Sequence, residues 1–237
     1  GFHYYYLTQS SLCASGSLPS DTMVPIHYEI SYTDVNCYGG DDGRIVVDMQ
    51  SNLTNPFYYY LDGVLNTNPI DSVFDDLSTG TYTISLTDNL NCYIEEEIVI
   101  DEPTFPLQVV TTDTITTCHA DSTAYSVAMG IGGTPFAGGD YLYNWYSGVV
   151  GPNNPTISTN DTAFNLPSGT YFVRITDANG CDTFTTVNVI GPQTPLTASP
   201  ELFNVSCKGD NTGMIVGDAS GSWAPYTYYW LDMQGDT

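Results

Sequence analysis

The chain contains few of the side chains that most often perform enzyme chemistry. Its three histidines, His3, His27 and His119, lie far apart and in no spacing typical of a metal or catalytic motif. The glycine-rich stretch "GIGGTPFAGG" lacks the lysine and the strand-to-helix context of a phosphate-binding loop. We therefore predict that these residues carry out no catalysis.

Carboxylates near turns are the candidate metal ligands. Asp41, Asp42 and Asp210 stand close to glycines, and Asp88 and Asp177 precede expected hairpin turns. Loop carboxylates are hard oxygen ligands that suit calcium, but the same residues are good turn formers, and calcium needs six or more oxygens. We expect no cofactor, with calcium at Asp41, Asp42, Asp88 or Asp177 as the alternative.

Charge narrows the classes of partner. Lys and Arg total 3 against 27 Asp and Glu, which gives a formal net charge of −24. Nucleic acids and anionic membranes both attract basic patches, so neither is an expected partner. The chain also has no apolar run long enough for a membrane-spanning helix, so we expect no membrane insertion.

Two phrases recur along the chain, and each carries a cysteine. "GTYTISLTDNLNC" at 80–92 matches "GTYFVRITDANGC" at 169–181, with a diverged copy at 1–13. The second phrase begins at Asn36, Thr117 and Ser206 as "NCYGGDDGRIVV", "TCHADSTAYSV" and "SCKGDNTGMIV". Proline-containing linkers lie between the copies, at Pro25, Pro103 and Pro192. We therefore divide the chain into a tail of a preceding repeat (1–25), a first repeat (26–106), a second repeat (107–196) and the N-terminal part of a third repeat (197–237).

The repeats read as β-structure. Tyr82, Ile84 and Leu86 alternate with polar residues, and Tyr171, Val173 and Ile175 do the same in the second copy, as expected for half-buried strands. The following strand continues the period through Ile94, Ile98 and Ile100 or through Val187 and Val189, although Glu96 is polar. Asn179-Gly180 predicts a tight hairpin turn. Short strands with regular turn signals predict tandem immunoglobulin-like antiparallel β-sandwiches of about seven strands each.

Aromatic residues fit the same fold. The patterns Leu77, Gly80, Tyr82 and Leu166, Gly169, Tyr171 resemble a tyrosine corner, and Trp145 and Trp230 suit a central strand. The aromatic runs could also stack on sugars, for which Tyr58, Tyr60 and Tyr229 are the candidates. We favour core packing, because the runs recur at one position of each repeat and alternate residues must face the core.

The order of motifs resembles a known family. "C-x-G-x-x-D-G", "P-Y-x-Y-x-W" and "L-x-x-G-x-Y-x-x-x-x-x-D-x-x-x-C", followed by a β-run and a proline, are similar to the SprB-type repeat of Bacteroidota gliding-motility cell-surface adhesins. The resemblance implies a stalk segment of a long filamentous adhesin that serves attachment and gliding motility. It also implies export by the type IX system to the outer-membrane surface. The implied partners are further copies of the repeat, outer-membrane gliding or secretion machinery, and extracellular surfaces or polysaccharide. The alternative is a spacer or carbohydrate-binding array of a secreted polysaccharide-degrading enzyme.

The resemblance also directs attention to modification. Secreted proteins of this phylum carry O-glycans at Asp followed by Ser or Thr and then an apolar residue or Thr. The matching acceptors are Thr22, Ser72, Thr114, Ser122 and Thr162. We expect glycans at some of these positions.

The six cysteines predict disulfides in an oxidising, extracellular setting. In one scheme Cys37 pairs with Cys92 and Cys118 with Cys181, leaving Cys13 and Cys207 to partners outside the sequence. In the other, Cys13 pairs with Cys37, Cys92 with Cys118 and Cys181 with Cys207. We favour the first scheme, because a bond closing a loop of about 60 residues within one repeat adds about 4 kcal/mol in the chain-entropy model.

Overall fold

The computed structural model describes residues 5–14, 23–49, 57–67, 72–88, 93–112, 114–148 and 155–231. Every regular element in these residues is a β-strand, which confirms the predicted all-β class. None of the described residues forms a helix with the length and apolar character to cross a membrane. The chain divides into two compact units. Unit 1 is Gly1–Gln108, Ile131–Tyr141 and Thr176–Asp182, and unit 2 is Val109–Gly130, Leu142–Ile175 and Thr183–Thr237.

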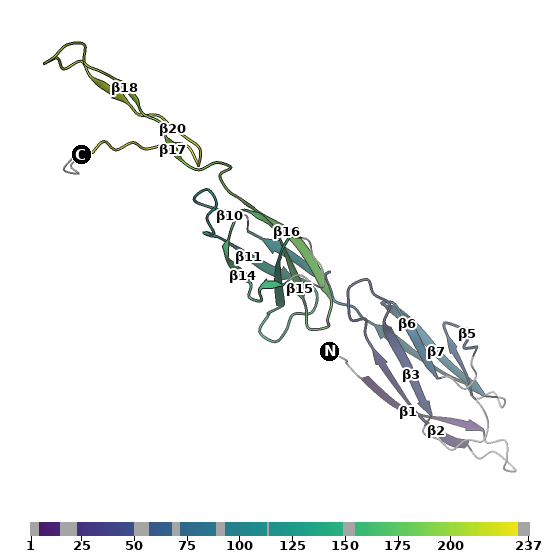
Figure 1. Cartoon of the computed structure of the whole chain (residues 1–237). Coiled ribbons are helices and arrows are strands. Elements are labelled where there is room, and N and C mark those ends of the chain that lie inside the picture. Colours follow the sequence, from purple (N-terminus) through teal and green to yellow (C-terminus); the bar gives the residue numbers. More distant parts are fainter. Residues whose placement is uncertain are drawn as a thin grey trace. The chain divides into compact units, whose positions relative to one another are not determined.

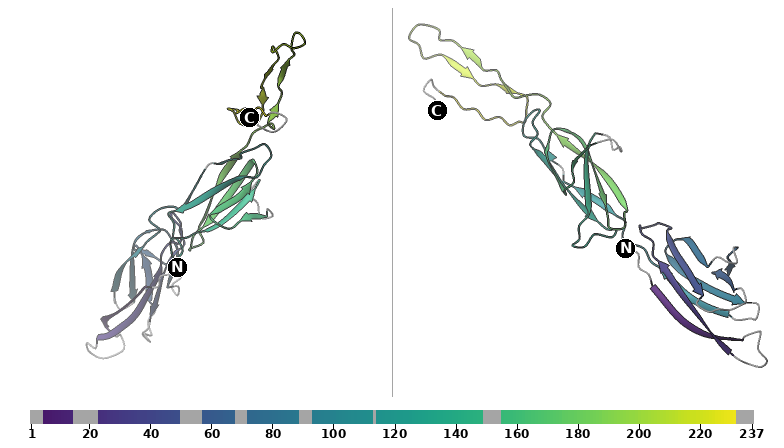
Figure 2. Two further views of the ribbon diagram at one scale, coloured as in Figure 1. Left: turned by 90° about the vertical axis from the view of Figure 1, so that its left-hand side faces the viewer. Right: turned by 60° about the horizontal axis from the view of Figure 1, so that its bottom comes forward.

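Unit 1 contains a sandwich of two antiparallel four-stranded sheets (Figure 1). The strand orders are β1-β2-β3-β6 and β5-β4-β7-β8. The first sheet consists of β1 (Tyr5–Ala14), β2 (Met23–Thr33), β3 (Gly43–Met49) and β6 (Val73–Leu77). The second consists of β4 (Phe57–Leu61), β5 (Val64–Leu65), β7 (Gly80–Asp88) and β8 (Tyr93–Ile100). Figure 2 shows β1, in purple, at the edge of its sheet.

Alternation of apolar and polar residues places the core of this sandwich. Ile84 and Leu86 on β7 are fully buried, as are Ile98 and Ile100 on β8, and Tyr82 packs against the same cluster. Burying one such aliphatic side chain contributes about 1.5–3 kcal/mol. The predicted inward faces of both strands are therefore confirmed.

The second sandwich, most of which belongs to unit 2, also consists of two sheets, here of three and five strands. Its sheets have the orders β14-β11-β9 and β10-β16-β15-β12-β13. The strands are β9 (Gln108–Thr111), β10 (Thr114–Ile115), β11 (Ala124–Ile131), β12 (Leu142–Ser147), β13 (Thr156–Ser158), β14 (Thr162–Leu166), β15 (Gly169–Thr176) and β16 (Asp182–Ile190). The chain passes from one sheet to the other between β9 and β10, and β10 then pairs parallel with β16.

The second core is built around a tryptophan. Trp145 on β12 is completely buried, and its indole N–H donates a 3.0 Å hydrogen bond to the carbonyl of Asn160. Val173 and Ile175 on β15 and Val187 on β16 are buried as well. The predicted core position of Trp145 is confirmed.

Two local devices occur in both sandwiches. Tyr82 donates a 2.9 Å hydrogen bond to the carbonyl of Ser78, and Tyr171 donates a 2.8 Å hydrogen bond to the carbonyl of Pro167. These are the tyrosine corners that the sequence pattern predicted. A β-bulge also interrupts the pairing of β3 with β6 and of β11 with β14. The same fold, an immunoglobulin-like antiparallel sandwich, is therefore present twice.

Residues 197–231 of unit 2 form two short antiparallel ladders. One joins β17 (Thr197–Ala198) to β20 (Ala219–Ser220), and the other joins β18 (Glu201–Phe203) to β19 (Met214–Val216). Leu202, Met214 and Ile215 are exposed in these ladders. A two-stranded ladder with uncovered apolar side chains is at best marginally stable by itself in water.

The repeat boundaries stay predictions. Residues 5–14 of the predicted tail form β1, which pairs along its whole length with β2. Strand β2 runs without a break across the boundary that we placed between residues 25 and 26.

Candidate functional site

A disulfide joins two loops that are far apart in the sequence. Cys37 lies in the loop between β2 and β3, and Cys181 lies in the turn between β15 and β16. Their sulfurs are bonded, with a Cα–Cα distance of 5.7 Å and a sequence separation of 144. Both residues belong to unit 1. The bond therefore links a cysteine of the first repeat to a cysteine of the second.

This bond corrects both pairing schemes drawn from the sequence. Because Cys37 is bonded to Cys181, it pairs with neither Cys92 nor Cys13, and Cys181 pairs with neither Cys118 nor Cys207. Cys118 and Cys207 are free, exposed thiols, so the proposed Cys92–Cys118 pair is also wrong. Cys92 lies outside the described residues, and the side chain of Cys13 does as well.

The strands explain why the scheme within one repeat fails. The N–H of Thr116, two residues before Cys118, donates a 2.9 Å hydrogen bond to the carbonyl of Ile190 at the end of β16. Cys181 lies just before the first residue of the same strand. A nine-residue strand spans roughly 30 Å. A disulfide requires two Cα atoms within about 7 Å, so Cys118, close to the end of β16, cannot reach Cys181, which precedes the start of that strand.

The turn that carries Cys181 is organised by Asp177. This carboxylate is almost completely buried and accepts hydrogen bonds from the backbone N–H groups of Thr134 (2.8 Å), Asn179 (3.0 Å) and Cys181 (2.9 Å). Three N–H donors compensate a carboxylate for the loss of water. Asp177 therefore fixes the turn and holds it to the loop at Thr134.

Asn179 connects the same turn to the loop of Cys37. Its side-chain amide donates hydrogen bonds to the carbonyl of Asn36 (2.9 Å) and to the hydroxyl of Thr134 (3.1 Å). The predicted Asn179-Gly180 turn is present, with a φ of 87° at Gly180. The polar contacts of Asn179 were not predicted, although the sequence "TDANGC" at 176–181 singled out the turn.

The loop of Cys118 has its own polar cluster. Asp121 accepts hydrogen bonds from the hydroxyl of Thr117, the hydroxyl of Thr123 and the N–H of Cys118. Partial burial acts to raise the pKa of Asp121, but these hydrogen bonds outweigh it and leave the pKa below its usual value. The carboxylate therefore stabilises the loop in its ionised form.

Most of the predicted calcium ligands whose side chains are described accept hydrogen bonds from N–H groups. Asp42 accepts from the backbone and side-chain amides of Asn36, Asp210 accepts from the N–H of Cys207, and Asp177 accepts the three donors above. In the part of the chain that the structure describes, no group of three or more His, Cys, Asp or Glu side chains could hold a metal ion. Asp41 is exposed, and the side chain of Asp88 lies outside the described residues. The expected lack of a cofactor stays a prediction, with calcium as its alternative.

The predicted glycosylation sites differ in accessibility. Ser122 is exposed in the loop after Cys118, whereas Ser72, Thr114 and Thr162 are half-buried. Thr114 begins β10 and Thr162 begins β14, and the Thr162 hydroxyl donates to Asp161. Thr22 lies outside the described residues. Among the described acceptors, Ser122 is the best placed for a glycan.

Two other groups of candidate residues can be located. A ring nitrogen of His119 lies 2.8 Å from the carbonyl of Pro192, a structural contact, while the side chains of His3 and His27 lie outside the described set. Tyr58 and Tyr60 are half-buried on β4, and Tyr229 is 78% exposed.

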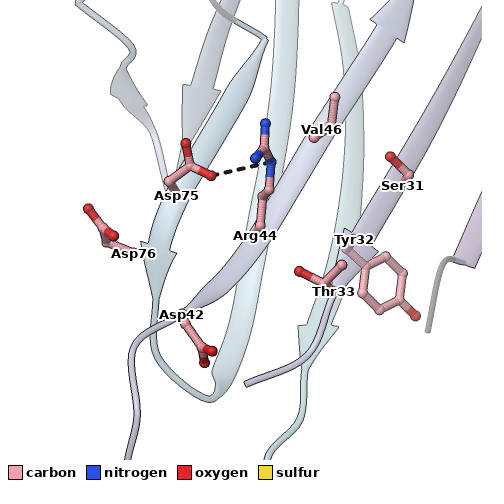
Figure 3. A pocket seen from close by; sticks show the side chains of 8 residues that line it. All are labelled: Ser31, Tyr32, Thr33, Asp42, Arg44, Val46, Asp75 and Asp76. Carbon is pink, nitrogen blue, oxygen red and sulfur yellow. Dashed lines mark ion pairs between the residues drawn. The ribbon is translucent and has the colours of Figure 1, made fainter. Parts of the chain in front are cut away.

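An open depression lies on the outer face of the first sandwich. Figure 3 shows it lined by Ser31 and Thr33 on β2, Arg44 on β3 and Asp75 on β6. The Arg44 Nε atom lies 3.3 Å from Asp75 Oδ1, and both side chains are about half exposed. An ion pair this exposed contributes at most about 1 kcal/mol. These side chains include no nucleophile paired with a base.

Part of the chain is similar to a known repeat family. The family model of the SprB repeat matches residues 202–235, which carry the third copy of the cysteine phrase, so the resemblance noted from the sequence is confirmed there. This match supports a non-catalytic repeat module of a cell-surface protein. No curated protein matches the chain.

Two solved structures match the chain at low sequence identity. The chain is 11% identical to DIP-gamma IG1+IG2, with a TM-score of 0.30, covering 64% of this chain and 89% of the other. It is 13% identical to the three N-terminal domains of the highly immunogenic outer capsid protein (Hoc) of bacteriophage RB49, with a TM-score of 0.38, covering 94% of this chain and 71% of the other.

Proposed function

We propose that this chain is a segment of a long filamentous cell-surface adhesin, whose tandem sandwiches form a stalk for attachment and gliding motility. The observation that carries the proposal is the match of residues 202–235 to the SprB repeat. The two similar sandwiches upstream extend it, because a chain of modules that contact mainly their neighbours grows in length with each added copy. The work of such a stalk is to hold an adhesive region away from the cell.

The composition fits this role. A net charge of −24 keeps neighbouring copies apart and keeps the stalk soluble. The bond between Cys37 and Cys181 adds a covalent connection between successive repeats, which suits a protein that is pulled along its length. Its proposed partners are further copies of the repeat, outer-membrane gliding or secretion machinery at its base, and extracellular surfaces or polysaccharide at its free end.

A second candidate function is a spacer or carbohydrate-binding array of a secreted polysaccharide-degrading enzyme. The observation that favours it is the exposure of aromatic side chains, since Tyr229 is 78% and Trp230 is 52% exposed. Exposed aromatic faces can stack on sugar rings. The buried position of Trp145, which occupies the same place in the second repeat as Trp230 in the third, favours core packing instead.

Labelling of living cells distinguishes these functions. Monovalent antibody fragments raised against residues 26–196 would be bound to cells of the source organism and followed by fluorescence microscopy, with cells lacking the gene as the control. We expect gene-dependent label that moves along the cell body. A gene-dependent label that stays fixed would contradict the gliding role and leave a static adhesin. Label found only in the medium would contradict both and support the secreted enzyme.

A further inference from the structure

One loop conformation occurs three times, and each copy holds a cysteine. The loops are those of Cys37, Cys118 and Cys207. In each loop, the cysteine carbonyl accepts a hydrogen bond from the N–H three residues later. The donors are Gly40 (2.9 Å), Asp121 (3.4 Å) and Asp210 (3.1 Å). The N–H of the residue before each cysteine is held by the side chain of Asp42 (2.9 Å), Thr123 (3.1 Å) or Thr212 (3.1 Å). The three cysteines therefore occupy equivalent positions.

Their bonding states differ. Cys37 is bonded to Cys181 in the β15–β16 turn of the second repeat, whereas Cys118 and Cys207 are exposed thiols. The bonded copy thus pairs with the next repeat, and no described turn of a third repeat holds the cysteine that would correspond to Cys181. In the second repeat, the free thiol of Cys118 thus occupies the position at which Cys37 forms a disulfide in the first repeat.

A backbone contact between successive repeats also occurs twice. In unit 1, the N–H of Gly133 donates a 2.8 Å hydrogen bond to the carbonyl of Phe105 in the linker before the second repeat. In unit 2, the N–H of Ser222 donates a 2.9 Å hydrogen bond to the carbonyl of Thr194 in the linker before the third repeat. The loop after β11 and the loop after β20 are therefore seated on their linkers in the same way.

The glycine before each donor shows how close these contacts are. A Cβ atom on Gly132 would lie 2.1 Å from the carbonyl oxygen of Pro106, and one on Gly221 would lie 2.0 Å from that of Pro195. Both glycines have positive φ, 75° and 79°. No side chain fits at either position. The two contacts between successive repeats therefore have the same backbone conformation as well as the same hydrogen bond.

The loop after β11 and the loop after β20 are each connected by hydrogen bonds to the cysteine loop of the preceding repeat. In unit 1, Thr134 contacts Asn179, which donates to Asn36 beside Cys37. In unit 2, the indole N–H of Trp223 donates a 2.9 Å hydrogen bond to the carbonyl of Thr116, two residues before Cys118. The third repeat thus approaches the loop of Cys118 as the second approaches the loop of Cys37.

We infer that Cys118 forms a disulfide with the cysteine that follows the Asn-Gly type turn of the third repeat, the position that Cys181 holds in the second. By the same rule Cys207 bonds to the repeat after that. Each repeat is then covalently bonded to the next by a disulfide as well as by the proline-containing linker. The inference rests on the internal repetition and holds whether or not the stalk serves adhesion.

The chemistry is a two-electron oxidation. The thiols of Cys118 and of its partner each lose one proton and together lose two electrons, and one S–S bond forms. A disulfide-bearing oxidant accepts the electrons by thiol–disulfide exchange. The Cys118 thiolate attacks one sulfur of the oxidant, which forms a mixed disulfide and releases the first oxidant thiol. The partner thiolate then attacks the Cys118 sulfur of this mixed disulfide and releases the second oxidant thiol.

The test is a disulfide map of the full-length protein isolated from its own cells. The protein is denatured and alkylated without reduction, then cleaved before aspartate. Cys118 falls in "DTITTCHA" (113–120), Cys37 in "DVNCYGG" (34–40) and Cys181 in "DANGC" (177–181). The linked pair of the last two is the internal control. We expect the Cys118 peptide to be linked to a peptide from the corresponding turn of the next repeat. Alkylated Cys118, or Cys118 linked to any other cysteine, would overturn the inference.

An extended chain provides a second test. Residues 1–230 are followed by a second copy of residues 146–196, because Trp145 and Trp230 hold equivalent places in their repeats. We expect Cys118 to resist alkylation and to be linked to the copied Cys181. In the matched variant with serine at the copied position, Cys118 should be alkylated. Alkylation of Cys118 to the same extent in both chains would contradict the inference, and if the extension does not fold, the map of the natural protein decides.

Discussion

The hydroxyl of Tyr28 donates a 2.7 Å hydrogen bond to the carboxylate of Glu96, which lies on the opposite sheet of the first sandwich. Tyr28 is buried, and this bond supplies its polar end with a partner. The relationship explains why a glutamate interrupts the apolar face of β8. Burial, followed by the hydrogen bond and the charge of Glu96, raises the pKa of Tyr28 above its ordinary value.

Alkaline pH should therefore weaken the first sandwich. Below about pH 10 the Tyr28 hydroxyl is protonated in both the folded and the unfolded chain. Above it the unfolded chain loses the proton while the folded chain retains it, so the free energy of unfolding falls as pH rises. We expect denaturant melts between pH 9 and 11.5 to show this decline, and Tyr28→Phe to make it shallower. A residual slope should remain, because burial also raises the pKa of Tyr59 and Tyr171. An unchanged slope in Tyr28→Phe would exclude Tyr28 as a source.

The Cys37–Cys181 bond should dominate stability under oxidising conditions. In the chain-entropy model, a bond closing a loop of this length contributes up to about 5 kcal/mol. We expect the double variant Cys37→Ser, Cys181→Ser to lower the free energy of unfolding by a large part of that amount. Cys118→Ser is the matched control, since Cys118 occupies the equivalent loop position as a free thiol, and it should change the stability of this chain by less than about 0.5 kcal/mol. Equal effects of the two changes would show that the bond is not formed.

The tyrosine corner of the second sandwich should be sensitive to loss of one oxygen atom. Tyr171→Phe leaves the carbonyl of Pro167 without its donor in a partly buried site, so we expect a loss of about 1–2 kcal/mol in chemical denaturation. Tyr229→Phe, at an exposed tyrosine, should change stability by less than about 0.5 kcal/mol. Similar losses in the two variants would contradict a specific role for the corner.

The loop of Cys118 should become more stable when one of its residues is replaced. Ala120 has a φ of 58°, while Gly39 and Gly209 occupy the equivalent position with φ of 73° and 94°. A Cβ atom makes this left-handed conformation unfavourable. We expect Ala120→Gly to raise the free energy of unfolding by about 0.5–1 kcal/mol. Gly39→Ala should lower it by about 1 kcal/mol, purely through the backbone, since a Cβ there would meet no atom within 4 Å. Destabilisation by Ala120→Gly would show that the alanine side chain makes a contact of its own.

The fold was predictable because its signals are local. The alternation of Ile84 and Leu86, the Asn179-Gly180 turn and the corner at Tyr171 each depend on residues close in sequence, and the structure has all three. The disulfide was not predictable in this way. The partner of Cys37 is set by which loop of the next repeat lies beside it, and sequence spacing contains no information about that. The same holds for Asp177, whose sequence neighbourhood fits a turn or a metal ligand equally well and whose buried N–H donors become visible only in three dimensions.

The bond between Cys37 and Cys181 has a practical consequence for anyone who expresses parts of this protein. A fragment cut at the linkers to contain only residues 107–196 would carry Cys118 and Cys181, the latter separated from its partner Cys37. Two such copies could then cross-link through their exposed sulfurs during purification, giving dimers that do not exist in the intact chain. The smallest fragment that retains this native cross-link must span two adjacent repeats.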